Sequence, residues 1–264
     1  MSEPRLAVAD PAALPIRAVN SEPAEVGLRV TVTALAAIMR RITRRDWRDR
    51  QKVPRTGPAI FVVNHISNID PLVYGHYIAC AGRWPRFLAK ASIFRTPVVG
   101  WVARACGQIK VDRDRADGGG AMAEAAAALA AGGSVSIYPE GTITFDPDGW
   151  PMNGRTGAAR LALETGAPLI PVAQWGAQDI LGGKKLTFPR FFPPRTVHVI
   201  TGDPVDIDDL RGEPPTAGTL LLITDRIMDS LTALVGDLRQ ELPPRGRWDP
   251  RLRRRVVRRH REER

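Results

Sequence analysis

The chain has 264 residues, and its 38 Lys and Arg residues outnumber its 28 Asp and Glu residues to leave a formal net charge of +10. This length is enough for one sizeable core, and the charge predicts attraction to an anionic partner such as a phosphate, a lipid headgroup or nucleic acid. No apolar segment near Met1 is typical of a secretory signal, and the uncharged stretch from Val30 to Met39 is far shorter than the ~20 apolar residues that cross a bilayer. The sequence therefore predicts neither a signal peptide nor a spanning helix.

The first 50 residues divide into two segments of different composition. Residues 1–23 mix prolines with small and charged residues and show no steady period, so we predict a flexible arm. In residues 24–50 apolar side chains recur three or four positions apart from Leu28 to Ile42, and arginines crowd the end of the segment up to Arg48. This pattern predicts an amphipathic helix. The helix either caps the core or associates with an anionic membrane through its arginines.

Beyond residue 51, short apolar segments alternate with helical segments. Ala59 to Val63 is branched and wholly apolar, as in a strand that is buried on both faces. Such alternation is typical of a layered α/β domain with a largely parallel sheet flanked by helices, and sites form at the strand ends of such sheets. We assign residues 51–242 to this domain. Further strands are expected at 86–89, 108–111, 134–138, 169–173 and 197–201, and helices at 122–131, 158–165 and 217–240.

Residues 243–264 form a strongly basic end of the chain. Pro243 and Pro244 stop the preceding helix. From Arg245 to Arg264, ten Arg residues against three acidic residues leave a net charge of +7. We predict a solvated basic tail, with an anchor on an anionic membrane and a nucleic-acid patch as alternatives.

An imidazole and a carboxylate follow the first apolar strand. His65 and Asp70 are five residues apart in the segment NHISNID, on an expected turn from strand to helix where the two side chains reach each other. A His that acts as a general base needs a carboxylate to fix its tautomer and to stabilise the imidazolium. We predict that this pair deprotonates a hydroxyl of the substrate. The spacing alone is also common in pairs with a structural role.

A second polar turn follows another apolar strand, at Tyr138 to Thr142 (YPEGT). Gly141 frees the backbone there to approach an anion closely. Glu140, taken alone, reads as a structural acid in an ion pair. Because this turn and the turn at His65 both end strands, their combination is far more specific than either part.

With these two turns the chain resembles the glycerophospholipid acyltransferase family, whose type member makes phosphatidic acid from 1-acyl-sn-glycerol 3-phosphate. Four blocks of the family occur in the expected order within about residues 57–176. The first is the His-x4-Asp box at His65, and the third is the Pro-Glu-Gly-Thr turn at Glu140. The second block resembles Gly107 to Arg113 (GQIKVDR), and the fourth resembles Ala167 to Ala173 (APLIPVA).

The resemblance implies roles for individual positions. His65 is the general base and Asp70 orients it. A thioester carbonyl under attack develops negative charge, which N–H groups in a Gly-containing turn or a nearby cation stabilise. A phosphate on the acceptor is a remote handle that an Arg grips through two oxygens. The residues implied around the acceptor's glycerol phosphate are Arg113, Glu140, Gly141 and Thr142.

One position departs from the family pattern. The family commonly has Arg directly after Glu-Gly-Thr, and this chain has Ile143. Arg155 occurs where many relatives carry Lys before a Gly, so it either replaces the missing cation or is a plain surface Arg. The predicted identity of the acceptor depends on whether Arg155 replaces the missing cation or is a surface residue.

We therefore expect an enzyme that moves a fatty acyl group from acyl-CoA or acyl-carrier protein to the free hydroxyl of 1-acyl-glycerol 3-phosphate. It would act as a peripheral or monotopic protein at the cytoplasmic face of the cell membrane, with no metal, no bound organic cofactor and no nucleic-acid partner. The same chemistry on another lysophospholipid or on a phosphoinositide mannoside is an alternative. A non-catalytic binder of anionic membrane or nucleic acid is an alternative from a different class.

Overall fold

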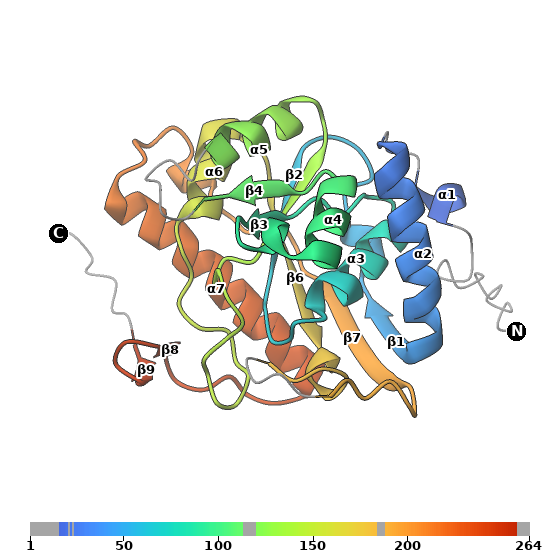
Figure 1. Cartoon of the computed structure of the whole chain (residues 1–264). Helices are drawn as coiled ribbons and strands as arrows, with labels where there is room; N and C mark the ends of the chain where they lie inside the picture. The colour runs from blue at the N-terminus through green and yellow to red at the C-terminus, as the bar shows by residue number, and fades with distance from the viewer. Residues whose placement is uncertain (1–15, 21, 23, 113–119, 184–187, 258–264) are drawn as a thin grey trace, which may run out of the picture.

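A five-stranded sheet runs through the computed structural model (Figure 1), which describes residues 16–20, 22, 24–112, 120–183 and 188–257. The strand order is β1-β7-β6-β2-β5, and every pairing is parallel except that of β6 with β7. β2, β5 and β6 point the same way, so their carboxyl ends meet at one edge. The strands are β1 (Thr43–Arg48), β2 (Ala59–Val63), β5 (Ser134–Ile137), β6 (Leu169–Trp175) and β7 (Arg195–Thr201).

Two small sheets complete the strand content of the described chain. β3 (Leu88–Lys90) and β4 (Ile109–Val111) form a parallel pair, which a bridge between Phe87 and Ser136 joins to β5. β8 (Arg247–Asp249) and β9 (Arg254–Val256) form an antiparallel hairpin near the C-terminus. The first pair extends the main sheet beside the predicted site.

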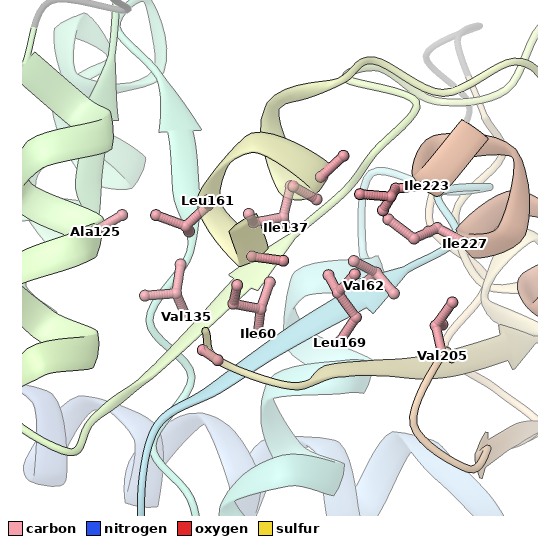
Figure 2. Close-up of a cluster of buried hydrophobic side chains, with 14 of the residues drawn as sticks. Ile60, Val62, Ala125, Val135, Ile137, Leu161, Leu169, Val205, Ile223 and Ile227 are labelled. Carbon is pink, nitrogen blue, oxygen red and sulfur yellow. The ribbon is translucent and has the colours of Figure 1, made fainter. Parts of the chain in front are cut away.

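Helices cover both faces of the main sheet, because its strands alternate between two apolar cores. Ile60 and Val62 of β2 lie in one core with residues of three helices, including Ile223 of the long C-terminal helix (Figure 2). Phe61 and Val63 lie in the opposite core. This arrangement confirms the predicted α/β fold. The helices are α1 (Ile16–Val19), α2 (Val26–Ile42), α3 (Asp70–Cys80), α4 (Pro97–Ala105), α5 (Ala121–Ala130), α6 (Gly157–Thr165) and α7 (Ala217–Arg239).

The N-terminal segment differs from the prediction at both of its boundaries. Ile16 is buried, and a carboxylate oxygen of Glu22 accepts the N–H of Trp84 at 2.7 Å, so the prediction of a flexible arm is wrong for these two residues. The helix ends at Ile42 instead of near residue 50, and residues 43–48 pair with β7 as an edge strand. Backbone pairing along a whole strand outweighs the local helical pattern there.

One face of α2 is part of the protein core. Its buried side chains are Leu28, Val32, Ala36 and Met39, three or four positions apart as predicted. The helix therefore caps the core, and its outer face remains available for other contacts. None of the described helices is long and apolar enough to cross a membrane.

The basic end of the chain is partly folded. β8 and β9 pack on the molecule, and Arg247 donates to Oδ1 of Asp225 on α7 at 2.6 Å. The prediction of a solvated tail is therefore wrong for Arg247 and Arg255, which bind acidic side chains of the main domain, whereas Arg251, Arg253 and Arg254 are exposed. Residues 258–264 lie outside the described residues.

Candidate active site

The His-x4-Asp turn begins where β2 ends and closes where α3 begins. Nδ1 of His65 lies 2.8 Å from Oδ2 of Asp70, the first residue of α3, so the predicted contact is present. Pro71 follows, in the first turn of a helix, where the missing N–H removes no helical hydrogen bond. The sequence thus brings the imidazole and the carboxylate together by a short turn.

The Asp70 carboxylate is held rigidly. It is fully buried, and its Oδ2 accepts the backbone N–H groups of Ile66 at 2.6 Å and of Ser67 at 2.8 Å. These bonds aim the same oxygen at the His65 ring. With the ring proton on Nδ1 donated to Asp70, the lone pair of Nε2 is free to accept a proton.

A second loop supports this turn from the side of β6. The side-chain amide of Asn68 donates to the carbonyl of Gly183 at 2.7 Å, and the hydroxyl of Ser67 donates to the carbonyl of Leu181. Both carbonyls follow the end of β6 in the chain. The His65 turn is therefore held by residues about 115 positions away in sequence.

The His65 ring stacks on an aromatic side chain. It stacks on Tyr138 with ring centroids 4.3 Å apart, and Tyr138 in turn stacks on Phe87 at 5.8 Å. Burial raises the pKa of Tyr138 well above its ordinary value, so the phenol is neutral. The His65 side chain remains 17% exposed, which leaves it a path to a substrate.

Glu140 joins the two predicted turns. Its Oε1 accepts the N–H of His65 at 3.0 Å, and its Oε2 accepts the N–H of Met152 at 3.0 Å. Burial raises the pKa of Glu140 to about 8, and hydrogen bonds from these two N–H groups oppose that shift. Each oxygen accepts a backbone N–H, so Glu140 bonds the His65 turn to the segment at Met152, and its implied place around the acceptor's glycerol phosphate stays a prediction.

Gly141 and Arg155 lie against each other. Gly141 has a φ of +72°, and a Cβ built on it would lie 2.9 Å from Nε of Arg155. The backbone N–H of Arg155 donates to the carbonyl of Pro139 at 2.8 Å, and the side chain is exposed. Only a glycine lets this guanidinium approach the turn so closely. Thr142 follows at the same turn and is half-buried.

The departure at position 143 has a structural counterpart. Ile143 is buried, and a Cβ built on Gly183 would lie 3.5 Å from its Cγ2. Position 143 therefore fills the interior with apolar packing and offers no cation to the surface. Arg113 lies outside the described residues.

Two contributions to the site were not predicted. The Asn64 side chain accepts the backbone N–H of Gln174 at 2.8 Å and donates to the Gln174 carbonyl at 3.0 Å, and the Gln174 side-chain amide donates to the Asn64 carbonyl at 3.1 Å. The N–H of Thr144 donates to the carbonyl of His65 at 2.8 Å. Gln174 could have been predicted, because it is a polar residue near the end of an otherwise apolar strand. Thr144 could not, because it contacts His65 through its backbone, which leaves no pattern in the sequence.

Comparison with known proteins decides the family. The model of the Acyltransferase family matches residues 44–175, which is half of the chain. The chain belongs to the Acyltransferase family. The matched region runs from β1 to the end of β6 and contains both the His65 turn and the Glu140 turn. The predicted resemblance is therefore confirmed.

Several relatives each match about half of the chain or less. A 1-acyl-sn-glycerol-3-phosphate acyltransferase of Borreliella burgdorferi is 32% identical over 131 residues, which cover 49% of this chain and 50% of the relative. A lyso-ornithine lipid O-acyltransferase of Pseudomonas aeruginosa is 32% identical over 116 residues, which cover 44% of this chain and 42% of the relative. The chain thus spans half or less of the length of these relatives.

A solved structure agrees with the Acyltransferase assignment at the level of fold. The crystal structure of the 1-acyl-sn-glycerophosphate acyltransferase of Thermotoga maritima superimposes with a TM-score of 0.62 at 21% sequence identity. The alignment covers 82% of this chain and 81% of that chain. The helices and the largely parallel sheet are therefore those of a known acyltransferase fold.

Proposed function

We propose that this protein transfers a fatty acyl group to the free hydroxyl of 1-acyl-sn-glycerol 3-phosphate, which yields phosphatidic acid for phospholipid synthesis. The contact between Nδ1 of His65 and Oδ2 of Asp70, at 2.8 Å, carries this proposal, because it supplies an oriented general base. The match to a 1-acyl-sn-glycerol-3-phosphate acyltransferase supports the acceptor. The acyl donor is acyl-CoA or acyl-carrier protein.

In the proposed reaction, Nε2 of His65 takes the proton of the acceptor hydroxyl. The hydroxyl oxygen then bonds to the thioester carbonyl carbon, and Asp70 stabilises the imidazolium that has formed. The carbon–sulfur bond breaks, and the departing thiolate takes the proton from the imidazolium. Because side chains of this chain supply every proton transfer, no step is assigned to a metal or an organic cofactor.

The phosphate of the acceptor is proposed to bind at the Gly141 turn. Arg155 lies over Gly141, and its guanidinium is exposed to a substrate. Because Ile143 is buried, Arg155 takes the role of the Arg that relatives carry after Glu-Gly-Thr. Arg113 and the half-buried Thr142 are proposed as further contacts to the glycerol phosphate.

The outer faces of α2 and α4 are proposed to contact the membrane that holds the acceptor. The two helices touch where a Cβ on Gly27 would lie 2.7 Å from the carbonyl of Ala105. Together they expose large apolar side chains: Val26, Val30 and Ile38 on α2, and Val99 and Trp101 on α4. A Trp is typical of the boundary between lipid and water, and the net charge of +10 favours an anionic surface. We propose peripheral binding at the cytoplasmic face.

The test of the activity is a panel of lysophospholipid acceptors with one labelled acyl-CoA and, separately, an acyl-carrier-protein donor. We expect transfer to lysophosphatidic acid, and loss of that transfer in folded His65→Ala. His198 is a matched control, because its Nδ1 also lies 2.8 Å from a carboxylate, Oδ2 of Asp46, at the sheet edge. Wild-type turnover by folded His65→Ala, with or without an effect of His198→Ala, would refute the mechanism.

A second acceptor class has specific support. The match to a lyso-ornithine lipid O-acyltransferase and the Ile143 position, where relatives commonly carry Arg, support a different lysolipid as the second candidate acceptor. A phosphoinositide mannoside fits the same hydroxyl chemistry. Faster transfer to one of these acceptors than to lysophosphatidic acid would select this alternative, and binding to anionic liposomes with no transfer to any acceptor would select a non-catalytic binder.

A further inference from the structure

The C-terminal hairpin turns two of its arginines toward the main domain. β8 and β9 approach closely at Gly246, where a Cβ would lie 2.8 Å from the backbone carbon of Val256 and where φ is +77°. Across the hairpin, Trp248 is paired with Arg255. The exposed fraction of the Arg255 side chain is 20%, whereas its neighbour Arg254 is exposed. Arg255 is thus unlike a solvated tail residue.

Arg255 binds the loop that follows Thr142. Its Nη2 lies 2.8 Å from Oδ1 of Asp146 and 2.8 Å from Oδ2 of Asp148. The Asp146 side chain is 1% exposed. A carboxylate buried this far needs a cation or several hydrogen bonds, because desolvation penalises its charge. Arg255 supplies that cation from the far end of the chain.

The same loop is bonded to the catalytic histidine. The N–H of Asp146 donates to the hydroxyl of Thr144 at 3.1 Å, and that hydroxyl donates to the carbonyl of Trp150 at 2.8 Å. The N–H of Thr144 donates to the carbonyl of His65 at 2.8 Å. One continuous set of hydrogen bonds therefore runs from Arg255 through the loop to His65.

We propose that Arg255 is a positioning residue for acyl transfer. By holding Asp146 and Asp148, it keeps the loop against His65 and keeps the Gly141 turn at a constant distance from the base. This inference rests on the proposed function, since it assigns the Gly141 turn to the acceptor. A misplacement of about 1 Å at a reacting group can cost on the order of 10²-fold in rate.

Anchoring of the hairpin does not depend on Arg255. Arg247 binds α7 separately, through Oδ1 and the carbonyl of Asp225 at 2.6 and 2.9 Å and through the carboxylate of Asp229. Loss of the Arg255 side chain therefore leaves the hairpin attached and releases the loop. An effect of Arg255→Ala on acyl transfer would therefore report the position of the loop and not the loss of the hairpin.

The test compares Arg255→Ala with Arg255→Lys and with Arg254→Ala, which removes the same charge from an exposed site on the same strand. We expect Arg255→Ala to raise the KM of the lysophospholipid acceptor about tenfold or more and to leave the KM of the acyl donor unchanged. Arg255→Lys recovers most of this loss because an ammonium still reaches Asp146. Arg254→Ala keeps wild-type kinetics, and Asp146→Asn combined with Arg255→Ala loses no more than Arg255→Ala alone.

Hydrogen exchange provides a readout that does not depend on activity. The amides of Thr144 and Asp148 are bonded to His65 and to Asp146, and we expect both to exchange about tenfold faster in Arg255→Ala. Unchanged exchange at these amides, or an equal rise in both KM values, overturns the inference. If the wild-type protein transfers no acyl group to any acceptor, the proposed function fails, and the exchange measurement still decides whether Arg255 holds the loop.

Discussion

The backbone N–H of His65 donates to Oε1 of Glu140 at 3.0 Å, so the carboxylate of one family motif holds the main chain of the other. The second oxygen of Glu140 accepts the N–H of Met152, so one side chain bonds both the His65 turn and the segment at Met152. Glu140, which the family resemblance places near the acceptor, thus also bonds the backbone of His65. His65 therefore contacts two acidic side chains, Asp70 at its ring and Glu140 at its backbone.

Asp70→Asn is expected to lower the rate of transfer by on the order of 10² to 10⁴. The amide oxygen can still accept the N–H groups of Ile66 and Ser67, so the turn persists, but no charge remains to stabilise the imidazolium of His65. Initial rates with labelled donor measure the loss, and circular dichroism checks the fold. A rate within threefold of wild type would contradict the role of Asp70.

Glu140→Gln is expected to flatten the dependence of stability on pH. Burial raises the folded-state pKa of Glu140 to about 8 from an ordinary value of 4.5. The folded protein therefore keeps a proton that the unfolded chain has released between those values, and the free energy of unfolding falls as pH rises, by up to about 1.4 kcal/mol per unit. Above about pH 8 this contribution is constant.

Urea unfolding measured between about pH 5 and pH 9 tests the sign of this slope. The difference between wild type and Glu140→Gln isolates the group from other titrating residues, and Glu164→Gln on the surface of α6 is the control. A stability that rises with pH in wild type relative to Glu140→Gln would show that the folded-state pKa is lowered.

Gly141→Ala is expected to reduce activity more than its effect on stability explains. The φ of +72° costs an alanine about 1 kcal/mol, and its Cβ would also displace Arg155, whose Nε is 2.9 Å away. Gly212→Ala is the matched control, because Gly212 has a φ of +88° with nothing within 4 Å of its Cβ position. Equal losses of activity in Gly141→Ala and Gly212→Ala would contradict the claim that the contact between Gly141 and Arg155 matters for activity.

Arg155→Ala is expected to raise the KM of a phosphate-bearing acceptor about tenfold to a hundredfold, the equivalent of one charged hydrogen bond. The KM of the acyl donor should not change, and an acceptor without a phosphate should be unaffected. Arg160→Ala on α6 removes a similar exposed charge that pairs with Glu164 at 3.9 Å and serves as the control. Identical kinetics of the two variants would leave Arg155 as a plain surface residue.

Trp101→Ser combined with Val30→Ser is expected to weaken flotation with anionic liposomes, because both side chains are exposed on the outer faces of α4 and α2. Leu221→Ser on α7 is the control for loss of an exposed apolar side chain. Flotation should also weaken as salt is added. A wild-type protein that fails to float even at low salt would contradict membrane binding through this surface.

The sequence predicted the parts of the fold that local pattern specifies. The all-apolar segment 59–63 predicted a strand buried on both faces, and the alternation of such segments with helical ones predicted the layered sheet. Residues 43–48 were assigned to a helix because their arginines continue its charge pattern. Pairing of Trp47 with Val199 on β7, which is distant in sequence, decided their strand structure.

The contact between His65 and Asp70 was predictable from sequence, since a turn of five residues brings the two side chains within reach of each other. Only the tertiary structure decided what surrounds them. Glu140 reaches His65 across 75 positions, and Arg255 reaches Asp146 across 109. Contacts over such separations depend on how strands and helices stack, and a local pattern carries no information about that stacking. The pair of His65 and Asp70 could therefore be predicted from the sequence, whereas the contacts of Glu140 and Arg255 could be identified only in the tertiary structure.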